Sequence, residues 1–353
     1  MTPPLLERPV PQPTAPHEPV MANRVTDLLS VPSGPAVLVD ATVGAAGHAA
    51  ALLAASSPQV HLVGFDRDPD ALALARRRLS AYGERVVLVH AGYDTLAEYV
   101  APLLGAVGPL LGVLYDLGVS SLQVDRVERG FSFRADAPLD MRMDPTEPRT
   151  AADLLNDAEE PELVRWLRTY GEERFAHRIA AAIVRARPLV TTAQLADVVA
   201  AAVPAAARRH SVIHPATRTF QALRIVLNAE LDRFSASLPQ ALELAAPTSP
   251  AGTGDAPGPG RGGRVAVLSY HSLEDRITKR FFSDAAAGCI CPPDLPVCGC
   301  GRVPLVRHLT RGAERPDDAE LDRNPRARSA RLRAAEKVAE GPIPPAPAPI
   351  QET

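Results

Sequence analysis

Short apolar runs alternate with helical patterns through the first third of the chain. The apolar runs are nearly continuous, which is typical of strands that are covered on both faces. They span residues 36–40, 61–66, 86–90 and 112–116. Helical patterns separate them at residues 49–55, 69–82 and 96–104. This alternation predicts a parallel sheet with right-handed crossovers, and therefore an α/β fold.

A fifth apolar run, residues 264–270, follows only after a long gap. The gap contains helical patterns, notably at residues 161–187 and 216–244. A helical insertion within an α/β domain is the economical interpretation. Near the end of the chain, residues 328–336 fit either a closing edge strand or a helix, and their propensities favour the helix.

Three segments have compositions that are typical of disorder or of surface loops. Residues 1–16 and 339–353 are proline-rich, and we expect both to be disordered tails. Residues 247–263 are rich in Pro, Gly, Ala and Thr, which predicts a flexible surface loop.

The net charge of the 353-residue chain is only −3, so the molecule as a whole is not a polycation. Nucleic-acid binding would therefore need a local patch. Residues 165–233 contain eleven arginines against five acidic residues, which suits phosphate contact, although helix surfaces are often arginine-rich. No stretch approaches the roughly 18 to 20 apolar residues that span a bilayer, and residues 1–16 lack a signal-peptide run. We expect a cytoplasmic protein without membrane contact.

The first two predicted strands end in acidic residues, and glycines follow the first. Asp40 ends the first strand, and Gly44 and Gly47 lie in the turn before a helix. Open α/β sheets bind ligands at the carboxyl ends of their strands, where glycines let the backbone approach a ligand closely. Asp66 ends the second strand, and a carboxylate there can accept hydrogen bonds from both hydroxyls of a ribose. The pattern predicts a nucleoside cofactor.

The turn itself distinguishes between two such cofactors. A dinucleotide needs Gly-x-Gly-x-x-Gly, because its pyrophosphate sits on a helix N-terminus. The sequence here is Gly44-Ala45-Ala46-Gly47-His48, which lacks the three-glycine pattern and favours S-adenosylmethionine. The alternative is that the glycines are ordinary turn residues and Asp66 is a helix cap. His48 is as compatible with capping or packing as with ligand contact.

The fourth predicted strand ends at Asp116, within Asp116-Leu117-Gly118-Val119-Ser120-Ser121. This end would face the transferred methyl group, so Asp116 could orient the attacking atom or hold its proton. Methylation at a pyrimidine ring carbon usually needs a cysteine nucleophile, and all four cysteines lie in one distant cluster. Nitrogen or oxygen is therefore the favoured acceptor. The alternative role of Asp116 is a structural cap on the following turn.

From about His17 to Lys337 the chain resembles a bacterial family that methylates N4 of a cytosine in the decoding region of small-subunit (16S) ribosomal RNA. The strings that carry the resemblance are 17–20 (HEPV), 40–48 (DATVGAAGH), 66–69 (DRDP), 116–121 (DLGVSS), 129–133 (RGFSF), 138–144 (PLDMRMD), 170–175 (YGEERF), 214–224 (HPATRTFQALR), 269–276 (SYHSLEDR) and 324–329 (NPRARS).

The resemblance implies a Rossmann-like class I methyltransferase core at residues 17–128 and 232–338, interrupted by a helical substrate-recognition insertion at residues 129–231. It implies 16S ribosomal RNA as partner, within the small ribosomal subunit, and a possible homodimer. The cofactor would be S-adenosyl-L-methionine, with Asp116 as the catalytic residue and no catalytic metal. The implied cofactor contacts are Ala46, Gly47, His48, Asp66, Tyr93, Asp116 and Gln123.

Two of these positions depart from the family pattern. Tyr93 stands where phenylalanine is more usual, and a ring that stacks on adenine survives that change. The family often has glycine near Ala45 and Ala46, so we expect the backbone there to avoid positive φ.

The cysteines form two Cys-x-Cys pairs, Cys289 with Cys291 and Cys298 with Cys300. Together they could give four thiolates to zinc, although the spacing is tighter than the usual gap of two to four residues. Four free thiols or a redox pair are the alternatives. Only part of the family has these cysteines, so the transfer reaction does not need them.

Other residues leave two interpretations open. His271 and Asp275 are spaced for one helix face, which suits catalysis or structural hydrogen bonding equally. Phe131 and Phe133 could stack on a flipped base, but core packing is the stronger expectation.

The sequence disfavours two other functions. A nicotinamide-dependent oxidoreductase is disfavoured by the missing third glycine. A non-catalytic RNA-binding assembly factor is disfavoured by the intact Gly47, Asp66 and Asp116.

Overall fold

The computed structural model describes residues 18–209, 213–248, 260–289, 291–292, 297 and 299–347. The predicted tail at 1–16, most of the predicted loop at 247–263 and the last six residues of the predicted tail at 339–353 lie outside these ranges. Residues 339–347 follow the last strand, and Ile343 among them packs against the core. No helix in the described ranges has both the length and the apolar character to cross a membrane.

Within the described ranges, seven strands form one sheet in the order β3-β2-β1-β4-β5-β7-β6. The strands are β1 Ala36–Asp40, β2 Val60–Asp66, β3 Val86–His90, β4 Leu110–Asp116, β5 Arg264–Ser269, β6 Val306–His308 and β7 Arg331–Lys337. Strands β1 to β5 pair in parallel, and β7 runs antiparallel to both β5 and β6. This arrangement confirms the predicted Rossmann-like α/β class.

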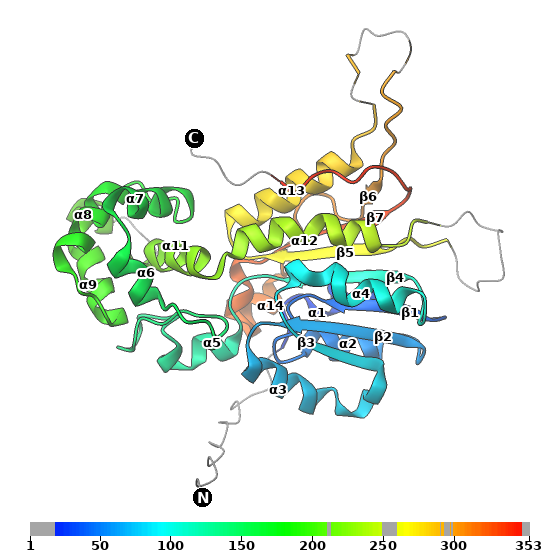
Figure 1. Cartoon of the computed structure of the whole chain (residues 1–353), viewed down its shortest axis with the longest axis horizontal. Helices are drawn as coiled ribbons and strands as arrows, with labels where there is room; N and C mark the ends of the chain where they lie inside the picture. The colour runs from blue at the N-terminus through cyan, green and yellow to red at the C-terminus, as the bar shows by residue number, and fades with distance from the viewer. Residues whose placement is uncertain are drawn as a thin grey trace, which may run out of the picture.

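Helices cover both faces of the sheet (Figure 1). One face packs against α1 Ala22–Leu29, α2 Gly47–Ala54 and α3 Pro69–Arg78. The other face packs against α4 Leu96–Leu104, α12 Glu230–Leu244 and α13 Ser272–Ala286. Every residue of β1 is buried, as expected for a strand covered on both sides.

A separate group of helices lies to one side of the sheet, on the left of Figure 1. It comprises α6 Ala151–Asp157, α7 Glu160–Thr169, α8 Ala176–Ala186, α9 Thr192–Ala202, α10 Ala205–Arg209 and α11 Thr217–Asn228. These helices have their own apolar cluster, which includes Leu163, Ile179 and Leu223. The arrangement suits the insertion predicted from the sequence, whose boundaries stay a prediction.

The helical patterns at 161–187 and 216–244 each break into two helices. Between α7 and α8, a Cβ on Gly171 would lie 2.7 Å from the Leu167 carbonyl oxygen and 2.8 Å from that of Arg218. Between α11 and α12, Ala229 has φ 49°. The short elements that complete the fold are α5 Ser121–Asp125, α14 Asp318–Arg323 and the 3₁₀ turns η1 Ser80–Arg85, η2 Tyr93–Thr95, η3 Val127–Arg129 and η4 Pro325–Ser329.

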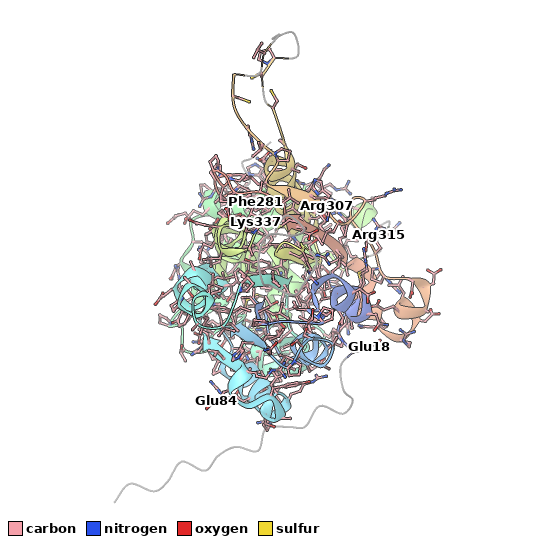
Figure 2. All side chains as sticks on the ribbon, turned by 90° about the vertical axis from the view of Figure 1, so that its right-hand side faces the viewer. Glu18, Glu84, Phe281, Arg307, Arg315 and Lys337 are labelled. Carbon is pink, nitrogen blue, oxygen red and sulfur yellow. The ribbon has the colours of Figure 1, made fainter. Side chains whose placement is uncertain are left out.

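The helix favoured for residues 328–336 is wrong, because most of this segment forms strand β7. Nor is β7 an edge strand, since β6 pairs with its outer side. Its neighbours decide the conformation against its propensities: six residue pairs join it to β5. Its Glu336 carboxylate is buried and lies 2.6 Å from the guanidinium of Arg307, which Figure 2 labels beside Lys337.

Polar contacts join α11 and the segment that precedes α6 to the core. The Arg129 guanidinium donates to the Asp68 carboxylate over 2.7 Å, and Asp68 is fully buried. The Asn228 side chain donates to the Met141 carbonyl and accepts from the Met143 amide. Arg67 donates to the Asn228 carbonyl. Because Arg67 and Asp68 directly follow Asp66, the Arg67 contact links α11, and the Asp68 contact links η3, to that strand end.

Candidate functional site

The sheet order places four polar strand ends side by side. Neighbouring strands β2, β1, β4 and β5 end at Asp66, Asp40, Asp116 and Ser269. The strand order reverses between β1 and β4, and open α/β sheets bind ligands in the crevice outside such a reversal. The residues predicted from the sequence at 40–48, 66 and 116 therefore share one edge of the sheet.

The turn after β1 is held between the strands on either side. The Gly44 amide donates to Asp66 Oδ2 over 2.9 Å, and the Asp68 amide donates to Asp66 Oδ1 over 2.8 Å. On the other side, the Asp116 amide donates to Thr42 Oγ1 over 2.8 Å. Each carboxylate oxygen of Asp66 has a second lone pair, so the group can still accept bonds from a ligand.

The backbone of this turn contradicts one expectation. Ala46 has φ 60° and ψ 35°, whereas the absence of glycine had predicted that positive φ would be avoided. The left-handed conformation costs a residue with a Cβ about 1–2 kcal/mol. Ala46 is fully buried and its amide donates to the Val43 carbonyl over 2.7 Å, so surrounding contacts hold the strained turn in place.

Packing within the chain explains why position 47 is a glycine. A Cβ at this position would lie 2.6 Å from Cγ of Pro19. A larger residue would therefore displace the segment that leads into α1. That segment belongs to the 17–20 string of the sequence, so the packing links two motifs that are far apart along the chain.

His48 is the first side chain of α2 to face the strand ends. It is 6% exposed, and burial lowers its pKa to about 4, so the imidazole is neutral at physiological pH. Its Nε2 lies 3.6 Å from Asp116 Oδ2, which is beyond hydrogen-bond distance. Among the described residues, neither ring nitrogen has a hydrogen-bond partner. Buried polar atoms of this kind are usually satisfied, so a ligand contact is the favoured interpretation of His48.

Asp116 is oriented from the neighbouring strand. The Tyr270 hydroxyl, one residue beyond β5, donates to Asp116 Oδ1 over 2.6 Å. Burial raises the pKa of Asp116 to about 6; the Tyr270 bond opposes this rise, and the charge of Glu274 adds to it. With Oδ1 engaged by Tyr270, Oδ2 is the oxygen left to accept a bond from a substrate.

Three aspartates gather their carboxyl groups at this edge of the sheet. Burial raises the pKa of Asp40 to about 7; its bond from the Thr42 amide opposes the rise, and the charges of Asp116 and Asp66 add to it. Burial likewise raises the pKa of Asp66 to about 6. Closely placed carboxyls disfavour one another's ionisation, and a bound cation would relieve that repulsion.

Tyr93 and Gln123, two of the predicted cofactor contacts, bond to neighbours within the chain. The Tyr93 ring stands edge-on to Tyr115 at 5.7 Å between centroids, and its hydroxyl donates to the Glu230 carbonyl over 3.5 Å. Gln123 forms a capping box with Ser120: each side chain accepts a bond from the other residue's backbone amide. This is a structural role for Gln123, and its contact with a cofactor stays a prediction.

Sequence reasoning missed Asp40 and Tyr270 as members of the site. The sequence marks Asp40 only as the end of a strand, although it lies between Asp66 and Asp116 along the sheet edge. Tyr270 belongs to the SYHSLEDR string, which by itself indicates no role for it. The rule that selected Asp116, a polar residue at the carboxyl end of a parallel strand, also applies to the residue after β5 and could have found it.

Several candidates take structural roles. Asp275 accepts bonds from Arg331 and Arg333. His271 directly precedes α13, with its Nε2 3.0 Å from Glu274 Oε1, and its catalytic use stays a prediction. Phe133 packs against Phe220 at 4.8 Å between ring centroids, as core packing predicts.

The arginine-rich region also contains internal contacts. Arg224 pairs with Glu230 over 2.8 Å, and Arg187 donates to two backbone carbonyls. Such arginines are engaged within the protein and are poor candidates for phosphate contact.

The chain is similar in sequence to known proteins over most of its length. The profile of the MraW methylase family matches residues 14–338. The chain is 50% identical over 325 residues to the ribosomal RNA small subunit methyltransferase H of Heliobacterium modesticaldum, covering 91% of this chain and 98% of that protein. It is 53% identical over 329 residues to the protein of the same name from Saccharopolyspora erythraea, covering 92% and 94%.

A solved structure of a putative rRNA methylase from Clostridium thermocellum is also similar, at 13% identity and a TM-score of 0.38. The similarity covers 91% of this chain and 95% of that one. At this distance the solved structure does not bear on function.

Proposed function

The chain belongs to the MraW methylase family, and we propose that it methylates the N4 amine of a cytosine in the decoding region of 16S ribosomal RNA, with S-adenosylmethionine as donor. Relatives that are 50% and 53% identical are methyltransferases of small-subunit ribosomal RNA, which supports the RNA substrate. The observation that supports this most directly is Asp116, a partly buried carboxylate with one oxygen held by Tyr270 and the other turned toward His48.

The residues at the strand ends fit S-adenosylmethionine. When bound, it supplies a methyl group on a positively charged sulfur. Asp66 would hold the ribose hydroxyls, the neutral His48 would contribute its unpaired ring nitrogens, and Asp40 and Asp116 would favour the positive charge. A nicotinamide dinucleotide would instead bring a pyrophosphate toward carboxylates. Binding measurements with both cofactors would separate the two functions.

Asp116 suits an amine acceptor. Its free oxygen can accept a hydrogen bond from an exocyclic N–H, which directs the nitrogen lone pair toward the methyl donor. Carbon methylation would need a cysteine nucleophile at this edge. The described cysteines lie instead in the segment between α13 and β6, which supports nitrogen as the acceptor.

Binding of S-adenosylmethionine is expected to weaken as the pH falls from 8 toward 5. The pKa values of Asp66 and Asp116 are raised to about 6, so both lose their charge as the pH falls through that value. Each pH unit below the pKa costs up to about tenfold in affinity for every carboxylate that must be ionised. Isothermal titration calorimetry measures this. S-Adenosylhomocysteine, whose sulfur is neutral, is the matched ligand and should show a shallower dependence; equal slopes would contradict the role of charge.

The RNA substrate is tested in cells. Ribosomal RNA from a strain that lacks this gene is expected to lose one methyl group from one cytosine of 16S RNA, as measured by mass spectrometry of nuclease fragments. Wild-type protein should restore the methyl group, whereas Asp116→Asn protein should not. Unchanged methylation in the deletion strain would contradict the proposal. Restoration of ribosome assembly by the Asp116→Asn protein would favour the alternative of an assembly factor.

A further inference from the structure

The three cysteines that the structure describes converge in the segment between α13 and β6. The Sγ atoms of Cys289, Cys291 and Cys300 all lie within 4.8 Å of one another. Those of Cys289 and Cys300 are 3.7 Å apart, although the two residues are eleven positions apart in sequence. The segment projects from the body of the molecule in both views (Figures 1 and 2).

The 3.7 Å between the Sγ atoms of Cys289 and Cys300 matches the spacing of two ligands to one metal ion. Zinc binds thiolates at about 2.3 Å in tetrahedral geometry, which places two such sulfurs about 3.8 Å apart. A disulfide would require about 2.05 Å. The Cys291 amide also donates to Cys289 Sγ over 3.4 Å.

The surroundings favour metal binding over burial in a core. Cys289 and Cys300 are exposed, and Cys291 is only partly buried, whereas cysteines without a special role are usually buried. The Gly301 backbone, with φ 61°, turns the chain directly after Cys300. An exposed projection has little apolar surface of its own, and a metal ion would hold its two arms together.

We propose that Cys289, Cys291 and Cys300 bind one zinc ion in a structural site separate from the strand-end residues. Thiolate ligands in tetrahedral arrangement select zinc among the divalent ions, with a fourth ligand completing the shell. The ion fixes the segment between α13 and β6 and takes no part in methyl transfer. In the fold, this segment lies on the far side of α13 from the helical group that contains α6 to α11 (Figure 1).

The experiment uses the full chain, purified under reducing conditions. Elemental analysis is expected to find one zinc per chain, and replacement by Co²⁺ should give the thiolate-to-cobalt charge-transfer bands of a tetrahedral sulfur site. Before chelation, Cys289, Cys291 and Cys300 should react slowly with a thiol reagent, and all three should react after it.

Single variants test the ligands. Cys291→Ser and Cys300→Ser should each weaken Co²⁺ binding at least ~10-fold, while Val303→Ser, an exposed change on the same segment, should not. Methyl transfer by Val303→Ser should also stay at the wild-type level. Reduced wild-type protein that takes up neither Zn²⁺ nor Co²⁺ would overturn the proposal, and so would a disulfide found by mass spectrometry in protein kept reduced. The metal-uptake and disulfide measurements both use wild-type protein, so the proposal stays testable even if a variant fails to fold.

Discussion

Replacement of Asp116 by asparagine is expected to slow methyl transfer at least ~10-fold, which corresponds to about 1.4 kcal/mol in the barrier. Asp116 Oδ1 accepts a bond from the Tyr270 hydroxyl, and an asparagine would keep that contact through its own oxygen. Its amide nitrogen would then replace Oδ2 and present N–H groups to the substrate amine. Two donors would face each other, so the amine would lose its orientation. Single-turnover rates at saturating cofactor measure the effect.

Two further variants make this result specific. Asp322→Asn changes an exposed carboxylate on α14 and should leave the rate unchanged. Tyr270→Phe removes a hydrogen bond that lowers the pKa of Asp116, so that pKa should rise above about 6. The acidic limb of the kcat/KM profile would then move to higher pH. An Asp116→Asn or Asp116→Ala enzyme with the wild-type rate would exclude the assigned role.

The sequence predicts well which strand ends form the site, because the end of a strand is a local feature of the sequence. Continuous apolar runs that end in Asp40, Asp66 and Asp116 mark the strands, and parallel pairing brings their carboxyl ends to one edge. The chain contains about 150 residues between β4 and β5, yet β5 still pairs with β4 in parallel. Periodicity and the rules of sheet topology suffice to predict this much.

Contacts between distant segments are what the sequence could not supply. No local signal indicates that the Tyr270 hydroxyl bonds Asp116, since 154 positions separate them. The positive φ of Ala46 opposes its own residue preference and depends on the packing around the turn. Strand β7 similarly opposes its helical propensity, because pairing with β5 and β6 outweighs it. In each case tertiary contacts override the preference of a single residue.

Asp66→Ala is expected to weaken S-adenosylmethionine binding at least ~30-fold, about 2 kcal/mol. The carboxylate lies at the end of β2 and already accepts bonds from the Gly44 and Asp68 amides. Its remaining lone pairs can accept the ribose hydroxyls, and hydrogen bonds to a charged group contribute about 1.5–3 kcal/mol each. Alanine removes both acceptors and loosens the turn that Gly44 begins. Isothermal titration calorimetry at pH 8, where Asp66 is ionised, measures the loss.

Comparing the two ligands distinguishes a hydrogen-bonding role of Asp66 from a purely electrostatic role. A ribose contact is common to S-adenosylmethionine and S-adenosylhomocysteine, so both should weaken by the same factor; a purely electrostatic role would weaken mainly the charged sulfonium compound. Asp70→Ala, a partly exposed carboxylate on α3, is the matched control and should bind both ligands as wild type does. Thermal unfolding of the two variants separates loss of binding from loss of structure. Wild-type affinity in a folded Asp66→Ala protein would contradict the ribose contact assigned to Asp66.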